Sequence, residues 1–204
     1  MYIEGNKKSS LGKDDGCSIN KALIESVNND KSSSNNSIRD KKYFIVTCTD
    51  CDIDIPSILG LNYTEVFIHR NMGNIIGEKD VNFQFAIKYA IDNHKIKHFL
   101  IIGHHSCNSF KEAIYPKKGG QNNKWLKNIR QIAEMNRNLL YEPKKDNQSY
   151  ERNFCEINVK EQMKRMGQLE VMQNYMEDGN KIYIVGLMLN GANGEMKEIQ
   201  TIHS

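Results

Sequence analysis

The sequence contains no apolar run that approaches the roughly 18 residues needed to cross a membrane. The start of the chain has no apolar segment of the kind found in secretory signals, and acidic residues appear early, which is unlike a transit peptide. Basic residues form no stripe interleaved with aromatic residues, and the formal net charge is only +3. We therefore expect a cytoplasmic protein that binds neither a membrane nor a nucleic acid.

The chain also lacks the pattern of a disulfide framework. Its five cysteines are an odd number and are widely spaced: Cys17, Cys48, Cys51, Cys107 and Cys155. In a cytoplasmic protein such thiols are expected to be reduced, and a patterned subset of them more often indicates a metal site or catalysis.

Internal repeats and a second domain are absent as well, and 204 residues are enough for one domain with a substantial core. Residues 1–40 are polar, and the low-complexity run KSSSNNS (31–37) predicts a partly disordered extension. Within it, residues 19–27 have the apolar spacing of a short helix that could dock on the main body. The composition changes near residue 41, so residues 41–204 are expected to form the folded domain.

Apolar runs in the folded part alternate with amphipathic segments. Strands are predicted at residues 43–47, 65–69, 98–103 and 181–189, helices at 81–94, 123–140 and 157–179 (one helix or two), and an edge strand at 197–202 after the turn signal NGANGEM. Alternating strands and helices predict an α/β fold, a mostly parallel sheet flanked by helices. We expect the last strand to pair antiparallel at one edge.

Candidate metal ligands stand where two of these strands end. Cys48 follows the first strand, and His104 and Cys107 follow the third, at the end of a sheet where α/β proteins gather their chemistry. Zinc takes four tetrahedral ligands, and a catalytic zinc site keeps one position open, so two thiolates and one imidazole suit it. Taken singly, each cysteine is more often a small core residue and the histidine a hydrogen-bonding one.

Several short motifs together make the assignment more specific. CTDCD (48–52), HRNMGNII (69–76), AIKYAI (86–91), GHHSC (103–107) and VGLMLNGANGEM (185–196) occur in an order and spacing that resemble the β-class carbonic anhydrases. INVKEQM (157–163) is similar to a helix start of the same family. The resemblance extends from about Tyr43 to the end of the chain.

This resemblance implies a fold, a reaction and a set of residues. The fold would be the β-carbonic-anhydrase fold, and the reaction the zinc-dependent, reversible hydration of carbon dioxide to bicarbonate. Cys48, His104 and Cys107 would bind Zn²⁺, and Asp50 would be the active-site aspartate. The protein would be an obligate homodimer, or a higher homo-oligomer, whose partners pack through the N-terminal helix and the apolar surface near the first two strands.

The chain departs from the family at two positions near this site. The family has an arginine two residues after the active-site aspartate, which pairs with the aspartate and holds it off the metal; this chain has Asp52. A carboxylate is a competent zinc ligand, so Asp50 is predicted to close the site as a fourth ligand. Arg70 is a weak replacement partner. The second departure is Asn108, where the family has glycine.

The neighbouring residues leave further alternatives open. Cys51 completes a Cys-x-x-Cys spacing that is typical of redox pairs, but carboxylates at 50, 52 and 54 would raise the pKa of such thiols. The same charges would disfavour ionisation of zinc-bound water. His105 is not expected to be a ligand, because it would point away from its neighbour His104.

Three functions therefore stay in consideration. The first is carbonic anhydrase activity, and the second is a zinc-closed relative with little activity and a binding or regulatory role. The third is an enzyme of the same fold that acts on carbonyl sulfide or carbon disulfide, which nothing in the sequence favours.

Overall fold

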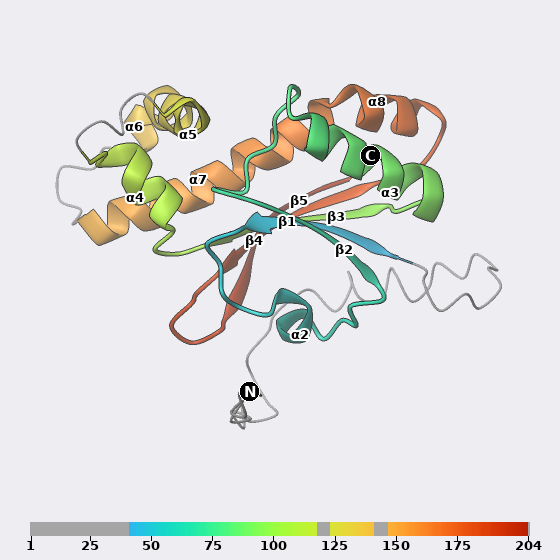
Figure 1. The fold of residues 1–204 in the computed structure, drawn as a ribbon, viewed down its shortest axis with the longest axis horizontal. Coiled ribbons are helices and arrows are strands. Elements are labelled where there is room, and N and C mark those ends of the chain that lie inside the picture. Colours follow the sequence, from blue (N-terminus) through green and yellow to red (C-terminus); the bar gives the residue numbers. More distant parts are fainter. Residues whose placement is uncertain (1–40, 118–122, 141–146, 204) are drawn as a thin grey trace, which may run out of the picture.

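The computed structural model describes residues 41–117, 123–140 and 147–203 (Figure 1). The predicted N-terminal extension, including the helix at 19–27 and the run at 31–37, lies outside the described residues. None of the described helices is long and apolar enough to span a bilayer.

One sheet with the strand order β2-β1-β3-β4-β5 forms the centre of the structure. The β1/β2, β1/β3 and β3/β4 pairs are parallel, and β4/β5 is antiparallel. The predicted α/β fold with an antiparallel edge strand is therefore confirmed. The strands are β1 (Tyr43–Cys48), β2 (Val66–Asn71), β3 (His98–His104), β4 (Tyr183–Leu189) and β5 (Met196–His203).

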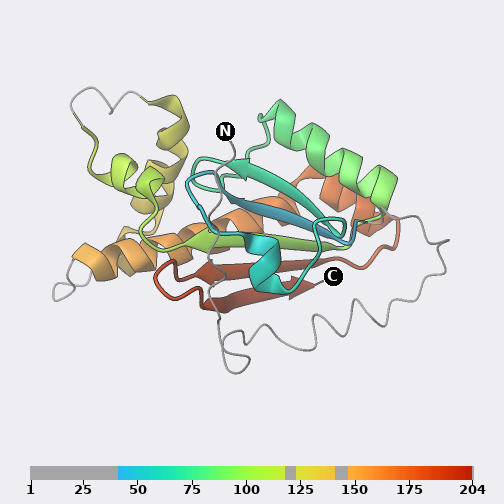
Figure 2. The same ribbon diagram turned by 60° about the horizontal axis from the view of Figure 1, so that its bottom comes forward.

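Helices cover the sheet on both faces. In Figures 1 and 2 the helices α3, α7 and α8 lie on one face and the short α2 on the other. Because both faces of the central strands are covered, every residue of β1 and β3 is buried. The helices are α2 (Ile55–Leu59), α3 (Val81–His94), α4 (Asn108–Ile114), α5 (Lys124–Met135), α6 (Arg137–Leu140), α7 (Asn147–Gln168) and α8 (Glu170–Glu177).

Several helix boundaries differ from those predicted. The helix expected over 123–140 is divided into α5 and α6 at Asn136. The segment at 157–163, expected to start a helix, lies in the middle of α7, which begins at Asn147. The short helices α2 and α4 were not predicted, since one or two turns give too little periodicity to detect.

Two glycines let α7 approach the sheet closely. A β-carbon on Gly103 of β3 would lie 2.6 Å from Val159 Cγ2, and one on Gly186 of β4 would lie 2.8 Å from Val159 Cγ1 and also collide with Met163. Such distances are shorter than van der Waals contact. Glycine at both strand positions therefore lets the helix carry bulky Val159 and Met163 against the sheet.

Replacing Gly186 by alanine should destabilise the fold by about 1–3 kcal/mol, because overpacking forces α7 away from β4. Gly167→Ala in α7 is the matched control, since its β-carbon would make an ordinary 3.6 Å contact with Ile184 of β4. That change should leave stability unchanged or raise it by up to about 1 kcal/mol. Urea denaturation of both variants at one protein concentration measures the difference, and equal effects would contradict the packing argument.

Candidate metal centre

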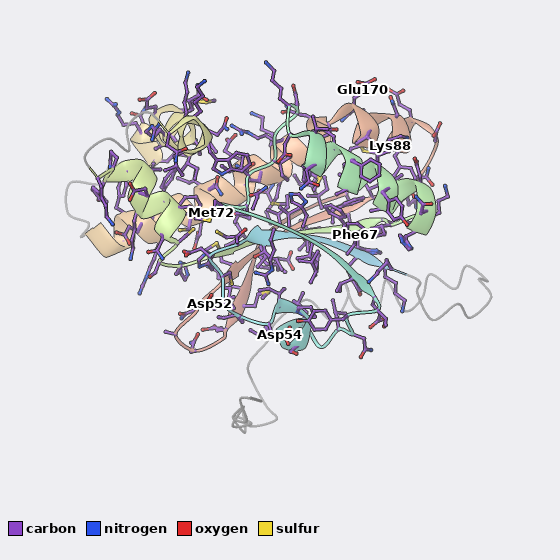
Figure 3. All side chains as sticks on the ribbon, viewed as in Figure 1. Asp52, Asp54, Phe67, Met72, Lys88 and Glu170 are labelled. Atoms are coloured by element: carbon purple, nitrogen blue, oxygen red, sulfur yellow. The ribbon has the colours of Figure 1, made fainter. Side chains whose placement is uncertain are left out.

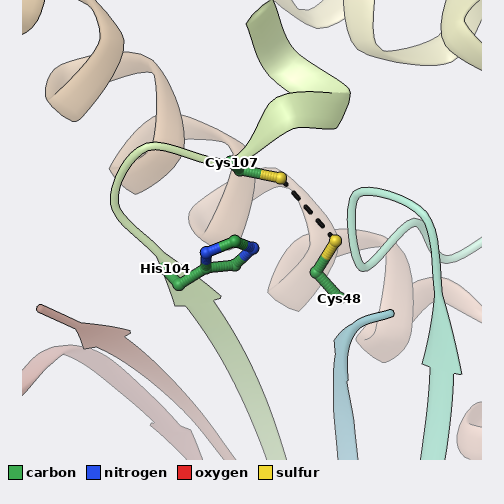
Figure 4. Close-up of side chains that lie close together, drawn as sticks. All are labelled: Cys48, His104 and Cys107. Carbon is green, nitrogen blue, oxygen red and sulfur yellow. Dashed lines mark hydrogen bonds between the residues drawn. The ribbon is translucent and has the colours of Figure 1, made fainter. Parts of the chain in front are cut away.

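Three potential metal ligands converge at the carboxyl ends of β1 and β3 (Figure 4). Cys48 is the last residue of β1, His104 is the last residue of β3, and Cys107 directly precedes α4. Their ligand atoms all lie within 4.8 Å of one another, and all three residues are buried. The structure therefore brings together the three ligands that the sequence predicts from two separate segments.

A tight turn after β3 places Cys107 opposite Cys48. Ser106 has a left-handed backbone (φ 62°), and the N–H of His105 donates to the carbonyl of Leu189 at 3.0 Å. The turn carries Cys107 Sγ to 3.6 Å from Cys48 Sγ. His105 is not a member of the three-residue group, and its exclusion from the ligand set stays a prediction.

The surroundings of the Cys48 sulfur favour a negative charge. Cys48 Sγ lies beside the Cys107 thiol and accepts hydrogen bonds from the backbone N–H groups of Gly73 at 3.1 Å and Asp50 at 3.4 Å. The Cys107 thiol, with help from these donors, lowers the pKa of Cys48 to about 4. The Cys48 thiolate, together with burial, raises the pKa of Cys107. A cation between the sulfurs would favour ionisation of both.

The histidine supplies a further indication of a metal. Within the described part of the chain, the buried Nε2 atom of His104 has no hydrogen-bond partner. Nδ1 of His105 is also buried without a partner among the described residues, so the indication comes from the position of His104 beside the two sulfurs. Two cysteine sulfurs and one imidazole nitrogen are a donor set that zinc prefers, and three protein ligands leave a fourth position. The residues present thus fit a zinc ion.

The HRNMGNII motif supports Cys48 through its backbone. The amide of Asn71 bonds the N–H and the carbonyl of Ile75, both at 2.7 Å, and so closes a turn around Gly73. Gly73 has φ 82°, and a β-carbon there would lie 2.8 Å from Ile129 Cδ1. Glycine is therefore required where the chain turns its N–H toward Cys48. Nothing in the residue types of this motif indicates that its backbone contacts Cys48, so this contribution to the site could not be found from the sequence.

A buried polar network connects this turn to α7. Asn158 Nδ2 donates to the carbonyl of Gly73 at 3.2 Å, Gln162 Oε1 accepts from the N–H of Ile76 at 2.7 Å, and Gln162 Nε2 donates to Asn158 Oδ1 at 2.9 Å. Both side chains are fully buried. Their polar atoms supply the hydrogen bonds that the turn cannot form within itself.

The aspartates at 50, 52 and 54 have different surroundings. Both carboxylate oxygens of Asp50 accept hydrogen bonds from Asn108, Oδ2 from its backbone N–H at 2.9 Å and Oδ1 from its side-chain amide at 3.1 Å. Asp52 is exposed in the loop that follows β1 (Figure 3). Asp54 caps α2 and accepts hydrogen bonds from Ser57 and Tyr63. Asp52 is thus an exposed surface group, and Asp54 is the N-terminal cap of α2.

Asp50 lies outside the group of ligand atoms that come within 4.8 Å of one another. Its predicted role as a fourth ligand stays a prediction, but its oxygens are engaged elsewhere. Arg70, considered as its partner, donates instead to the carbonyls of Cys48 at 3.2 Å and Cys51 at 2.9 Å. The thiol near Cys48 belongs to Cys107 rather than Cys51, and burial raises the pKa of Cys51.

Comparisons with known proteins agree with these observations. The family model described as carbonic anhydrase matches residues 43–196. The chain is 29% identical to a carbonic anhydrase of Emericella nidulans over 78% of this chain and 69% of that protein. It is 28% identical to a carbonic anhydrase of Candida albicans over 67% of this chain, but over only 48% of that protein.

Solved structures give the same result. The β-carbonic anhydrase of Coccomyxa, solved with acetazolamide, has a TM-score of 0.74 and 26% identity and covers 89% of this chain and 83% of its own. The β-carbonic anhydrase CafA of Aspergillus fumigatus has a TM-score of 0.71 and 27% identity and covers 78% of this chain and 76% of its own. The resemblance seen in the motifs is therefore confirmed.

Proposed function

The chain belongs to the carbonic anhydrase family, and from this premise we propose that it catalyses the reversible hydration of carbon dioxide to bicarbonate with zinc as its cofactor. The observation that carries the proposal is the buried group of Cys48, His104 and Cys107, at the ends of two neighbouring parallel strands. This donor set suits zinc and leaves one position for exchangeable water. A cytoplasmic location stays a prediction.

Each ligand has a defined part in holding the ion. Cys48 and Cys107 would bind as thiolates and balance the charge of Zn²⁺, and the N–H groups of Gly73 and Asp50 orient Cys48. His104 binds through the buried Nε2 that otherwise has no partner in the described structure. When bound, zinc supplies the Lewis acidity that activates water toward carbon dioxide. Asp50, two residues from Cys48, would be the group that orients the water to be activated.

The hydrogen bonds of Asp50 favour an open site over a closed one. A zinc-closed relative needs a carboxylate oxygen of Asp50 on the metal, whereas both oxygens accept hydrogen bonds from Asn108. These hydrogen bonds compete with coordination of a metal by Asp50. We therefore favour the active enzyme over the closed binding or regulatory protein.

Zinc content tests the ligand set directly. The purified protein should carry about one zinc per chain, and Cys107→Ser should lose it because a hydroxyl is a poor substitute for a thiolate ligand. Cys51→Ser is the matched control, since Cys51 is also buried but lies outside the group. His104→Ala and His105→Ala form a second pair, of which only the first should lose zinc. Elemental analysis that finds full zinc in Cys107→Ser would refute the assignment.

Activity is measured by stopped-flow hydration of carbon dioxide between pH 6.5 and 9.5. The zinc-loaded protein should accelerate hydration, and Cys107→Ser should not. Asp50→Asn, which keeps the shape but loses the charge, should retain zinc and lower turnover by on the order of 100-fold, as expected for loss of a group that orients a proton donor. A fully zinc-loaded native protein that gives only the uncatalysed rate would contradict the proposed function.

An exposed apolar surface fits a second copy of the chain. Among the described strands β2 lies at the edge of the sheet with a partner on one side only, and beside it Val81, Phe85 and Tyr89 of α3 are 81%, 70% and 42% exposed. These three residues follow at intervals of four and so share one helix face. With Phe67 of β2, which Figure 3 labels, they form a surface, and Phe85, Tyr89 and Phe67 line a shallow hollow in it. We assign this surface to the homodimer interface that the resemblance implies.

Phe85→Glu should weaken this dimer, because a buried, unpaired carboxylate is unfavourable in an apolar interface. Met135→Glu is the matched control, since Met135 is 73% exposed on α5, outside the proposed interface. Sedimentation velocity at micromolar concentration should show a dimer for the native chain and the control, and a shift toward monomer for Phe85→Glu. A stable native monomer would contradict the assignment.

A further inference from the structure

Asn108 forms two hydrogen bonds to a carboxylate beside the metal ligands. Its backbone N–H donates to Oδ2 of Asp50 and its side-chain amide donates to Oδ1, at 2.9 and 3.1 Å. The two residues are 58 positions apart in the chain and meet because the β1 and β3 ends are adjacent. Cys107, which precedes Asn108, supplies one of the candidate ligands. The contact thus links the segments that supply Cys48 and Cys107.

Without such a restraint, a carboxylate at this position would bind the metal. Asp50 is two residues from Cys48, and its N–H is 3.4 Å from the Cys48 sulfur. Carboxylate oxygens are good zinc ligands, and three protein ligands leave one coordination position for a fourth. A carboxylate bound there would exclude water, so the position of Asp50 decides whether the site is open.

Among the described residues, no basic side chain pairs with Asp50. Arg70 is engaged with the carbonyls of Cys48 and Cys51. At position 52, where the resemblance expects an arginine, the chain has an exposed aspartate, which cannot donate a hydrogen bond. The restraint on Oδ1 therefore comes from the Asn108 amide, a neutral donor on the opposite strand end.

We propose that Asn108 is a positioning residue. Its side-chain amide holds Asp50 off the metal and keeps the fourth coordination position open to exchange. It does so in place of the arginine missing at position 52. The two departures from the family's motifs, Asp52 and Asn108, are then related. Asn108, at the start of α4, supplies the hydrogen bond to Asp50 that an arginine at position 52 would otherwise supply. This inference rests on the proposed metal site.

The test measures access of a small anion to the metal. Each protein is loaded with Co²⁺ in place of zinc, its metal content is determined, and azide is titrated while the visible absorption of the metal is followed. Asn108→Ala removes the amide but keeps the backbone N–H, so it frees Oδ1 alone. Loss of one hydrogen bond to a charged group should let Asp50 compete with azide and weaken azide binding on the order of tenfold or more.

Two further variants separate this effect from general damage. The double variant Asp50→Ala with Asn108→Ala should bind azide as tightly as the native chain, because the competing carboxylate is gone. Asp52→Ala removes a nearby exposed charge without touching the Asp50–Asn108 contact, and it should not weaken azide binding.

The outcomes distinguish the inference from the proposed function. Weaker azide binding in Asn108→Ala that is restored in the double variant supports the role of Asn108. Native affinity in metal-loaded Asn108→Ala, or no recovery in the double variant, overturns that role alone. A native chain that holds no metal overturns the proposed function, and the role of Asn108 with it.

Discussion

The parallel pairing of β1 with β3 is the constraint on which both the core and the site depend. Thr47 lies opposite Ile102, so the two strands end within two residues of one another, at Cys48 and His104. Neighbouring strands are about 4.8 Å apart, which brings the two side chains within reach of one ion before any loop contributes. Only Cys107 needs an additional turn. A slip of one residue in this register would direct Cys48 to the opposite face.

The sheet could be predicted from the sequence because its strands are buried on both faces and form continuous apolar runs, as at 43–47 and 98–103. The first half of α7 could not, because NQSYERN (147–153) is polar and shows no apolar stripe. Asn158 and Gln162 further weaken the periodicity although both are fully buried. Their burial is explained by hydrogen bonds to a turn more than 80 residues away in the chain, which no local pattern contains.

The three ligand candidates could be found from motifs, because Cys48, His104 and Cys107 follow predicted strands directly. The partner of Asp50 could not be found, because Asn108 is distant in sequence and its amide has no fixed role by residue type. The sequence showed Asp52 and Asn108 as two unrelated departures and led to a prediction of a closed site. The contact between Asn108 and Asp50 connects them and favours an open site instead.

Gly73 joins the candidate metal ligands to α7, the longest of the described helices. Its N–H donates to Cys48 Sγ and its carbonyl accepts from Asn158 of α7. Docking of α7 and the charge on Cys48 are therefore thermodynamically coupled, because each stabilises the same backbone conformation. Loading the ion should slow hydrogen exchange along α7, and any mutation that loosens this helix should lower the affinity for metal, even from the far end of the core. In this chain the stability of α7 and the affinity for a metal ion should therefore change together.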